Sequence, residues 1–590
     1  MAKAAKTHKI RMMEEQLARK LNRQVVGSLV GCVHCGMCDQ ACHYVLAFPD
    51  DPKMTPSYKA DQLRKLFKAN HDWTGSVFPW WVGADKVPLS DDDLEALKDI
   101  SFGTCTNCRR CTLSCPMGVD TATLNRIMRG LLTHVGVMPE GVRVVSKDQW
   151  ELGNQMGVLK EDYLDTLEWM SEELEEDLGH SEAAIPVDEE GARIMYCINP
   201  REVKYDPRTI KEAALIFWAA GESWTMPSQG WDNTNFGLFS GDDGLGGASA
   251  KREYDTARAL GVEKIVISEC GHGYRSTRCE GVNWSGEAEA FPMESSVMTM
   301  LGYIKEGRIK VDPTRNPQKM TFHDSCNNAR SCGFFEEPRE LLRLVSMDFQ
   351  EMYPNRAENY CCTGGGGAMS MSEYTPRRLE SAKIKADQIR ATGAKVVVTS
   401  CHNCVDGLSD LIKHYGLDCE VKQLVNLVAN ALVIEEVKQP ETVAEQGELE
   451  VAAVAVKEPL AGRKVLVVDD EEDVRSFLMM VFEDAGAQVV SASDGDQAVA
   501  MAREHRPDLI SLDLSMPGKD GVETFVELRR TAETEEIPVC VVTGHPEFRQ
   551  VIYDRPVPPP EGYLGKPVDE EKLVAYAHHI IEHREAKKVH

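Results

Sequence analysis

The sequence lacks the features of a nucleic-acid-binding, secreted or membrane-spanning protein. It has 66 basic and 94 acidic side chains and a formal net charge of -28, whereas binding to phosphate backbones needs a basic surface. The first residues, MAKAAKTHKIRMMEEQLARK, contain no apolar core of a signal peptide. No apolar run reaches the roughly 18 residues that suggest a transmembrane helix. We therefore expect a cytoplasmic protein that binds no nucleic acid.

Several cofactor motifs are also missing. No C-x-x-C-H occurs, which excludes covalent c-type haem. No dinucleotide fingerprint for a flavin is present, and no G-K-[ST] follows the run of four glycines at 364–367, so that run is not a P-loop. At 590 residues the chain is too long for a single core, which predicts several domains.

Cysteine, by contrast, is abundant and grouped. The 19 cysteines include two runs, CVHCGMCDQAC and CTNCRRCTLSC, that share the spacing C-x2-C-x2-C-x3-C. This is the ligand spacing of bacterial ferredoxins, in which the fourth cysteine of each run binds the other cluster. A zinc site would use pairs of C-x2-C instead. We predict two cubane 4Fe–4S clusters, one bound by Cys32, Cys35, Cys38 and Cys115, the other by Cys105, Cys108, Cys111 and Cys42.

A long segment between the two runs carries VFPWWVG, residues 77–83. Its tryptophans, Trp80 and Trp81, shield a cluster, face a partner protein, or form part of the core of an inserted subdomain. Their sequence context does not separate these alternatives.

Short apolar segments that end in cysteine follow from residue 193 onward. They are RIMYC, EKIVISEC, QKMTFHDSC and AKVVVTSCHNC, and helical segments separate them. Such alternation predicts parallel sheets covered by helices, with ligands at the carboxyl ends of the strands. Five thiols then converge on one crevice and can hold an unusual iron–sulfur cluster: Cys326, Cys361, Cys362, Cys401 and Cys404. The glycines that follow Cys362 let the backbone approach it closely.

This segment resembles the cysteine-rich CCG domain of the heterodisulfide reductase family. The resemblance lies in HDSCNNAR, EPREL, CCTGGGG and SCHNC, and with the ferredoxin runs it covers roughly residues 25–435. The architecture is similar to the D subunit of heterodisulfide reductase and to DsrK. Thr363 stands where the family name places a glycine.

The resemblance implies a noncubane 4Fe–4S cluster on the five cysteines, where disulfide or trisulfide chemistry occurs. It also implies a cytochrome b-type membrane subunit, further electron-transfer subunits and a DsrC-like sulfur-carrier protein as partners. We therefore expect a peripheral protein on the cytoplasmic face of the inner membrane, acting in sulfur or sulfite metabolism.

The first half of the CCG region departs from the family pattern. It has no cysteine pair and no C-x-x-C, and keeps only Cys197, Cys270 and Cys279, which predicts one noncubane cluster rather than two. Cys270 and His272 either handle substrate and protons or remain from a lost ligand set. His323 and His402 are further candidates for proton supply, or are structural.

The C-terminal part resembles a response-regulator receiver domain. Its segments are RKVLVVDDEEDVR, PDLISLDLSMPGKDG, IPVCVVTGH and GYLGKPVD. The resemblance implies that Asp513 accepts a phosphoryl group from a histidine kinase. Asp469, Asp470 and Asp513 would hold Mg²⁺, and Thr543 and Lys566 would contact the phosphoryl group. Alternatively, the domain serves only for docking.

The predicted fold class is multidomain, mainly α and α/β. A helical two-cluster ferredoxin-like domain precedes an α/β CCG domain with parallel sheets and a flavodoxin-like receiver. The predicted boundaries are 1–150 for the ferredoxin-like domain, 151–192 for an acidic helical connector, 193–434 for the CCG domain, 435–462 for a linker and 463–590 for the receiver.

Three functions fit these features. The first is the catalytic subunit of a membrane-associated iron–sulfur oxidoreductase that the receiver regulates. The second is an electron-carrier subunit of a glycerol-3-phosphate, glycolate or lactate dehydrogenase, with the flavin on another subunit. The third is a redox-sensing signalling protein.

Overall fold

The structure is a computed structural model. It describes residues 7–434 except 86, 89, 181 and 182, then residues 459–543 and parts of 557–584. Residues 435–458 of the predicted linker lie outside the described residues. The chain divides into two compact units, Met1–Val437 and Lys438–His590, which we call the iron–sulfur unit and the receiver unit.

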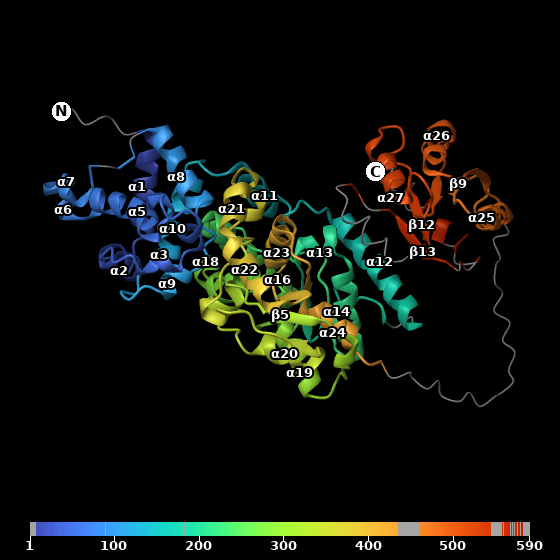
Figure 1. The fold of residues 1–590 in the computed structure, drawn as a ribbon, viewed down its shortest axis with the longest axis horizontal. Helices are drawn as coiled ribbons and strands as arrows, with labels where there is room; N and C mark the ends of the chain where they lie inside the picture. Colours follow the sequence, from blue (N-terminus) through green and yellow to red (C-terminus); the bar gives the residue numbers. More distant parts are fainter. Residues whose placement is uncertain are drawn as a thin grey trace. The chain divides into compact units, whose positions relative to one another are not determined.

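The N-terminal part of the iron–sulfur unit is helical (blue in Figure 1). Its principal helices are α1 (His8–Lys20), α2 (Arg23–Gly31), α5 (Pro56–His71), α8 (Asp91–Gly103) and α10 (Thr121–His134). They share one apolar core, and α10 packs against α1, α5 and α8. The two cysteine runs lie between these helices, on loops and on the short helices α3 (Met37–Ala41) and α9 (Arg110–Leu113).

Two four-stranded sheets follow, and every strand pair in them is parallel. The first has the order β2-β1-β3-β4 and the second the order β6-β5-β7-β8. The strands of the first are β1 (Ile194–Cys197), β2 (Trp224–Thr225), β3 (Lys264–Ile267) and β4 (Met293–Ser295). Those of the second are β5 (Lys319–His323), β6 (Asp348–Phe349), β7 (Val396–Thr399) and β8 (Glu420–Gln423). The matching order indicates two copies of one supersecondary unit.

Helices between the two sheets join them into one core. Val266 of β3 and Val396 of β7 belong to the same buried cluster, in which α14 packs against α24 and α19 against α20. The acidic helix α12 (Lys160–Leu178) adds one apolar face to this cluster. The helices of this region are α13 (Pro200–Tyr205), α14 (Arg208–Ala219), α16 (Asp243–Leu260), α19 (Ser296–Lys305), α20 (Glu337–Val345), α21 (Thr375–Ser381), α22 (Lys383–Thr392), α23 (His402–Tyr415) and α24 (Leu424–Ala431).

Two π-helical turns interrupt the regular pattern. One, η3 (Arg275–Glu280), follows the short helix α17 (Gly271–Tyr274) after β3, and the other, η5 (Asn327–Ser331), follows β5. π-helical turns are rare in proteins overall, but those that occur are often found at functional sites. Both lie beyond the carboxyl ends of strands, where ligands collect in parallel sheets.

The receiver unit contains a five-stranded parallel sheet of order β10-β9-β11-β12-β13, the order of flavodoxin-like folds. Its strands are β9 (Lys464–Val468), β10 (Gln488–Ala492), β11 (Leu509–Leu512), β12 (Val539–Thr543) and β13 (Gly562–Gly565). Helices α25 (Glu472–Asp484), α26 (Gly495–His505) and α27 (Gly521–Arg530) accompany them. The predicted fold class is confirmed in both units.

A buried ion pair fixes the loop that leads to Cys326. The guanidinium of Arg339 donates to both carboxylate oxygens of Asp324, at 2.7 and 2.8 Å, and neither side chain is exposed.

We predict that Arg339→Met, which leaves Asp324 buried without its cation, destabilises the iron–sulfur unit by about 3–5 kcal/mol. The matched control is Arg390→Met, since Arg390 forms a half-exposed pair with Asp387 that contributes about 1 kcal/mol or less. Thermal unfolding by calorimetry checks this, and equal effects of both substitutions would contradict it.

Candidate functional site

The first predicted cubane ligand set lines one cavity. Cys32, Cys35, Cys38 and Cys115 surround about 420 Å³. Left-handed residues His34 and Gly36, with φ of 54° and 76°, fold the first three cysteines into a tight loop. The fourth cysteine of this set, Cys115, comes from the second run. These side chains therefore lie in the crossed arrangement that the ferredoxin spacing predicts.

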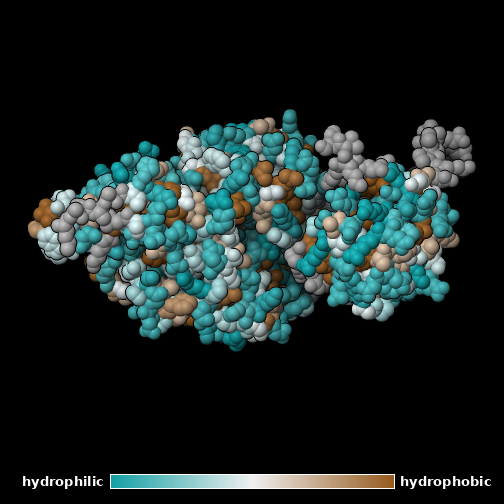
Figure 2. All heavy atoms as spheres, turned by 90° about the horizontal axis from the view of Figure 1, so that it is seen from above, coloured by the Kyte–Doolittle hydropathy of each residue, from teal (hydrophilic) through white to brown (hydrophobic). Residues whose placement is uncertain are grey.

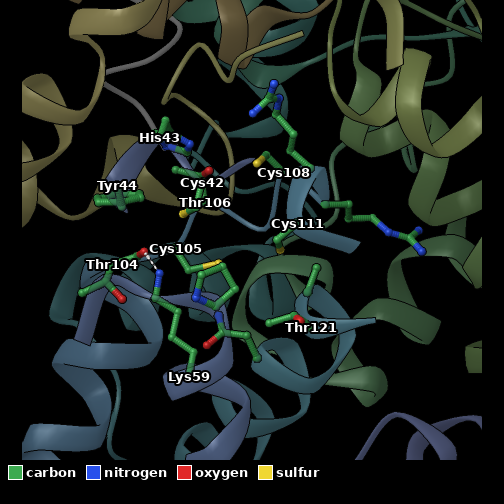
Figure 3. A pocket seen from close by; sticks show the side chains of 15 residues that line it. Cys42, His43, Tyr44, Lys59, Thr104, Cys105, Thr106, Cys108, Cys111 and Thr121 are labelled. Carbon is green, nitrogen blue, oxygen red and sulfur yellow. Dashed lines mark hydrogen bonds between the residues drawn. The ribbon is translucent and has the colours of Figure 1, made fainter. Parts of the chain in front are cut away.

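The second ligand set lines a separate cavity of about 410 Å³. Cys42, Cys105, Cys108 and Cys111 point into it, as Figure 3 shows. Here the fourth thiol comes from the first run. The structure thus brings together each predicted set of four, and the ligand roles themselves stay a prediction.

The chemistry of these thiols suits metal binding. Burial raises the pKa of Cys38 to about 12 and also raises the pKa of Cys42 and Cys111. None of the 19 cysteines forms a disulfide. Four thiols lie together at each cavity, and iron can replace their protons as it binds. Both cavities therefore fit an iron–sulfur cluster.

The five remaining predicted ligands are buried together beyond the carboxyl ends of β5 and β7. The Sγ atoms of Cys362 and Cys404 are 3.2 Å apart. Cys401 hydrogen-bonds to Cys404, and Cys326 interacts electrostatically with Cys361 and Cys362. We call this group the five-cysteine site. His323 adds a possible ligand, because its ring nitrogen lies within 4.8 Å of the Cys362 and Cys404 sulfurs.

The five-cysteine site adjoins the second cubane site. Interaction with the Cys361 thiol, together with burial, raises the pKa of Cys108 to about 11. Thr106, between Cys105 and Cys108, places its hydroxyl 3.3 Å from the Cys361 sulfur. The loop of the second cubane site therefore contacts a member of the five-cysteine site directly.

The glycine run makes this approach possible. A Cβ on Gly364 would lie 1.9 Å from the Asn403 carbonyl oxygen, and one on Gly366 would lie 2.6 Å from the Thr106 carbonyl oxygen. Both contacts are to protein backbone, and Gly364 in addition hydrogen-bonds to the Cys362 sulfur. Thr363, where a glycine was expected, has φ of +67° and is fully buried. Its N–H donates to the Cys361 sulfur at 3.2 Å.

The first half of the CCG region contributes to this site without a ligand set of its own. The Nδ1 atom of His272 lies 3.4 Å from the sulfur of Cys270, and His272 interacts electrostatically with Cys401. Cys197 is buried elsewhere and has the carbonyl of Gly230 as its hydrogen-bond partner, at 3.8 Å.

The other two candidate histidines are neutral. Burial lowers the pKa of His402 to about 3 and that of His323 well below its usual range. Neither can carry a proton as a cation near neutral pH.

Two buried lysines were missed in the sequence. Lys59 lines the second cubane cavity and donates to the Thr104 carbonyl at 2.6 Å (Figure 3). Lys385 donates to the amide oxygen of Asn359 at 2.6 Å, and burial lowers its pKa to about 7. Lys59 shares the buried face of α5 with Leu63 and Leu66, so helical periodicity could have found it. Lys385 lies on the buried face of α22 with Ala386 and Ile389, but its hydrogen bond to Asn359 joins segments far apart in the chain and carries no local sequence signal.

The tryptophans of the inserted segment are exposed. Trp80 and Trp81, on α7 (Pro79–Val82), are 67% and 78% exposed, and Trp73 on α6 (Trp73–Val77) is 72% exposed. Figure 2 shows hydrophobic atoms at the end of the iron–sulfur unit where Figure 1 places these helices. The interpretation as part of a core is wrong.

The receiver residues also meet. Carboxylate oxygens of Asp469, Asp470 and Asp513 lie within 4.8 Å of one another. The ammonium of Lys566 lies 2.7 Å from Asp469 and 2.6 Å from Asp513. Burial acts to lower the pKa of Lys566, but these two hydrogen bonds outweigh it and raise that pKa. Thr543 is buried at the end of the neighbouring strand β12. Three oxygen ligands beside a cation suit Mg²⁺ and a phosphoryl group.

Three family models match separate parts of the chain. A 4Fe-4S dicluster domain matches residues 28–119, a cysteine-rich domain residues 320–408, and a response regulator receiver domain residues 465–578. These matches define the class of protein: an iron–sulfur protein that carries a receiver domain.

Known relatives specify the class further. The Hdr-like menaquinol oxidoreductase iron-sulfur subunit 2 of Archaeoglobus fulgidus is 26% identical over 68% of this chain and 79% of its own length. The D subunit of the dihydromethanophenazine:CoB–CoM heterodisulfide reductase of Methanosarcina mazei is 25% identical over 69% of this chain and 95% of its own. Protein PilH of Pseudomonas aeruginosa is 36% identical over 19% of this chain and 91% of its own.

The chain therefore combines a 4Fe-4S dicluster domain and a cysteine-rich domain with a C-terminal response-regulator receiver domain, and its iron–sulfur unit is similar to subunits of heterodisulfide reductase-like oxidoreductases. Among the described residues, no helix combines the length and apolar character that crossing a membrane requires.

The crossed arrangement of the two cavities can be tested by substitution. We predict that Cys42→Ser removes the same cluster signal as Cys105→Ser, and that Cys115→Ser removes the same signal as Cys35→Ser. Each variant should lose about four iron atoms. Iron content and EPR of the reduced protein check this. If Cys42→Ser and Cys35→Ser instead removed the same cluster signal, the crossed arrangement would be contradicted.

Proposed function

We propose that this chain is the catalytic subunit of a membrane-associated electron-transfer complex and reduces, or forms, a disulfide or trisulfide. The substrate would react at a noncubane 4Fe–4S cluster bound by the five-cysteine site. Two cubane 4Fe–4S clusters, bound by the two sets of four cysteines, would supply or remove electrons. The division of the chain into the five segments predicted from the sequence belongs to the same proposal.

The observation that carries this proposal is the 3.3 Å contact between the Thr106 hydroxyl and the Cys361 sulfur. The loop that holds Cys105 and Cys108 thus touches a ligand of the next predicted cluster, so electrons have a short path through buried protein. A cluster that binds a substrate sulfur can hold the half-reduced state, because cubane clusters pass one electron at a time and a disulfide needs two.

The surrounding side chains would assist this reaction. His272 is fully buried and its Nδ1 lies 3.4 Å from the Cys270 sulfur, so its ring forms part of the wall beside the site and helps to exclude water. Lys385, whose pKa is lowered to about 7 by burial, is influenced by Cys361 and Cys362 and is a group that can exchange a proton near neutral pH.

Partners follow from the relatives and from the surface. Relatives are named as subunits of menaquinol and dihydromethanophenazine oxidoreductases, which supports a cytochrome b-type membrane subunit, further electron-transfer subunits, and a place on the cytoplasmic face of the inner membrane. The exposed Trp73, Trp80 and Trp81 are suited to such a contact. A DsrC-like sulfur carrier, within sulfur or sulfite metabolism, is the proposed source of the disulfide or trisulfide.

EPR of the anaerobic, oxidised protein tests the reaction. We predict a paramagnetic signal that shifts when a thiol-carrying sulfur-transfer protein is added and that disappears in Cys361→Ala, while the cubane signals of the reduced protein remain. Cys419→Ala is the control, since Cys419 lies outside all three ligand sets and should change nothing. Cubane signals alone, with no thiol-sensitive species, would instead favour the electron-carrier or redox-sensing functions.

We further propose that Asp513 accepts a phosphoryl group from a histidine kinase in the presence of Mg²⁺. Asp513→Asn should abolish labelling of the full chain by acetyl phosphate, and a chelator of Mg²⁺ should do the same to the unchanged protein. Asp496→Asn is the control, because Asp496 is an exposed carboxylate of α26. Phosphorylation is followed as acid-labile phosphate. Equal labelling of both variants would contradict phosphorylation at Asp513 and would favour a receiver domain that serves only for docking.

A further inference from the structure

Two cysteines outside all three predicted ligand sets lie together at the surface. The Sγ atoms of Cys279 and Cys332 are 3.9 Å apart, with Cys279 exposed and Cys332 partly buried. Cys279 belongs to η3, and Cys332 ends η5. The pair thus joins the two π-helical turns, one from each half of the CCG region.

The two thiols are chemically unequal. Cys279 is the solvent-exposed thiol of the pair and Cys332 the partly buried one, and the hydrogen bond between them lowers the pKa of Cys279. Arg278 and Arg275 lower the pKa of Cys279 further, and Glu280 opposes them. A thiolate is the nucleophile in disulfide exchange. Cys279 is therefore the attacking thiol, and Cys332 is placed to resolve its product.

The backbone around the pair allows the sulfurs to move into bonding distance. A disulfide needs an S–S distance of about 2.05 Å. Gly333 follows Cys332 directly, has φ of +84°, and has no atom within 4 Å of the position of a Cβ. Arg275 already connects the two turns through a 3.2 Å hydrogen bond to Asn327, so they are held close before a covalent bond forms.

We propose that Cys279 and Cys332 form a thiol–disulfide exchange site that reacts with low-molecular-weight disulfides. The Cys279 thiolate attacks one sulfur of R–S–S–R, the S–S bond breaks, and one R–S⁻ leaves. Cys332 then attacks the Cys279 sulfur of the mixed disulfide, and the second R–S⁻ leaves. Two protein thiols become one disulfide, the reagent is reduced to two thiols, and the protons of the protein thiols end on them. This site goes beyond the proposed function and does not depend on it.

Exposure of the anaerobic full chain, with its clusters bound, to glutathione disulfide tests the proposal. After alkylation of free thiols, mass spectrometry of peptides should show a Cys279–Cys332 disulfide in the unchanged protein. Cys332→Ser should instead accumulate glutathione on Cys279. Cys279→Ser should react at this site at least about tenfold more slowly, because the attacking thiolate is gone.

Cys419→Ser is the matched control and should form the Cys279–Cys332 disulfide at the unchanged rate. The visible absorption of the clusters shows that each variant is folded. A stable glutathione adduct on Cys279 in the unchanged protein, or equal reaction of Cys332 with and without Cys279, would overturn the proposal.

Discussion

The absence of side chains at Gly364 and Gly366 sets the spacing between the second cubane site and the five-cysteine site. The backbone at Gly364 lies against the Asn403 carbonyl, between Cys401 and Cys404, and the backbone at Gly366 lies against the Thr106 carbonyl, between Cys105 and Cys108. A Cβ at either glycine would force these loops apart. The contact between Thr106 and the Cys361 sulfur, and with it the proposed electron path, depends on this close packing.

The first half of the CCG region has a structural role that explains why it persists without ligands. The carbonyl of Glu269 accepts a hydrogen bond from the His402 N–H at 3.0 Å. Its buried carboxylate accepts from the N–H groups of Leu424 and Val425, at 3.1 and 2.6 Å, and so satisfies the N-terminus of α24. The loop that carries Cys270 is thereby fixed against the loop that carries Cys401. One half supplies the five predicted sulfur ligands, and the other supplies the wall and His272.

Local patterns in the sequence predicted most of this. Spacing alone grouped the cubane cysteines, because a tight loop brings nearby cysteines together, and strand-ending cysteines located the five-cysteine site, because parallel strands share an edge. The contact of Cys279 with Cys332, the burial of Lys385 and the bond from Glu269 to α24 were not predictable. Each joins segments that are far apart in the chain, and no local periodicity encodes such a meeting.

Thr363 shows how the site can impose a conformation that its own sequence disfavours. A left-handed conformation costs a residue with a side chain about 1–2 kcal/mol, and a β-branched residue is the least suited to it. Two contacts hold Thr363 in this conformation. Its N–H donates a hydrogen bond to the Cys361 sulfur, and the next residue, Gly364, packs so closely against the Asn403 carbonyl that a Cβ there would clash. A thiolate ligand would strengthen that N–H bond, because charge-assisted hydrogen bonds are the stronger ones. Cluster binding would then stabilise the strained turn.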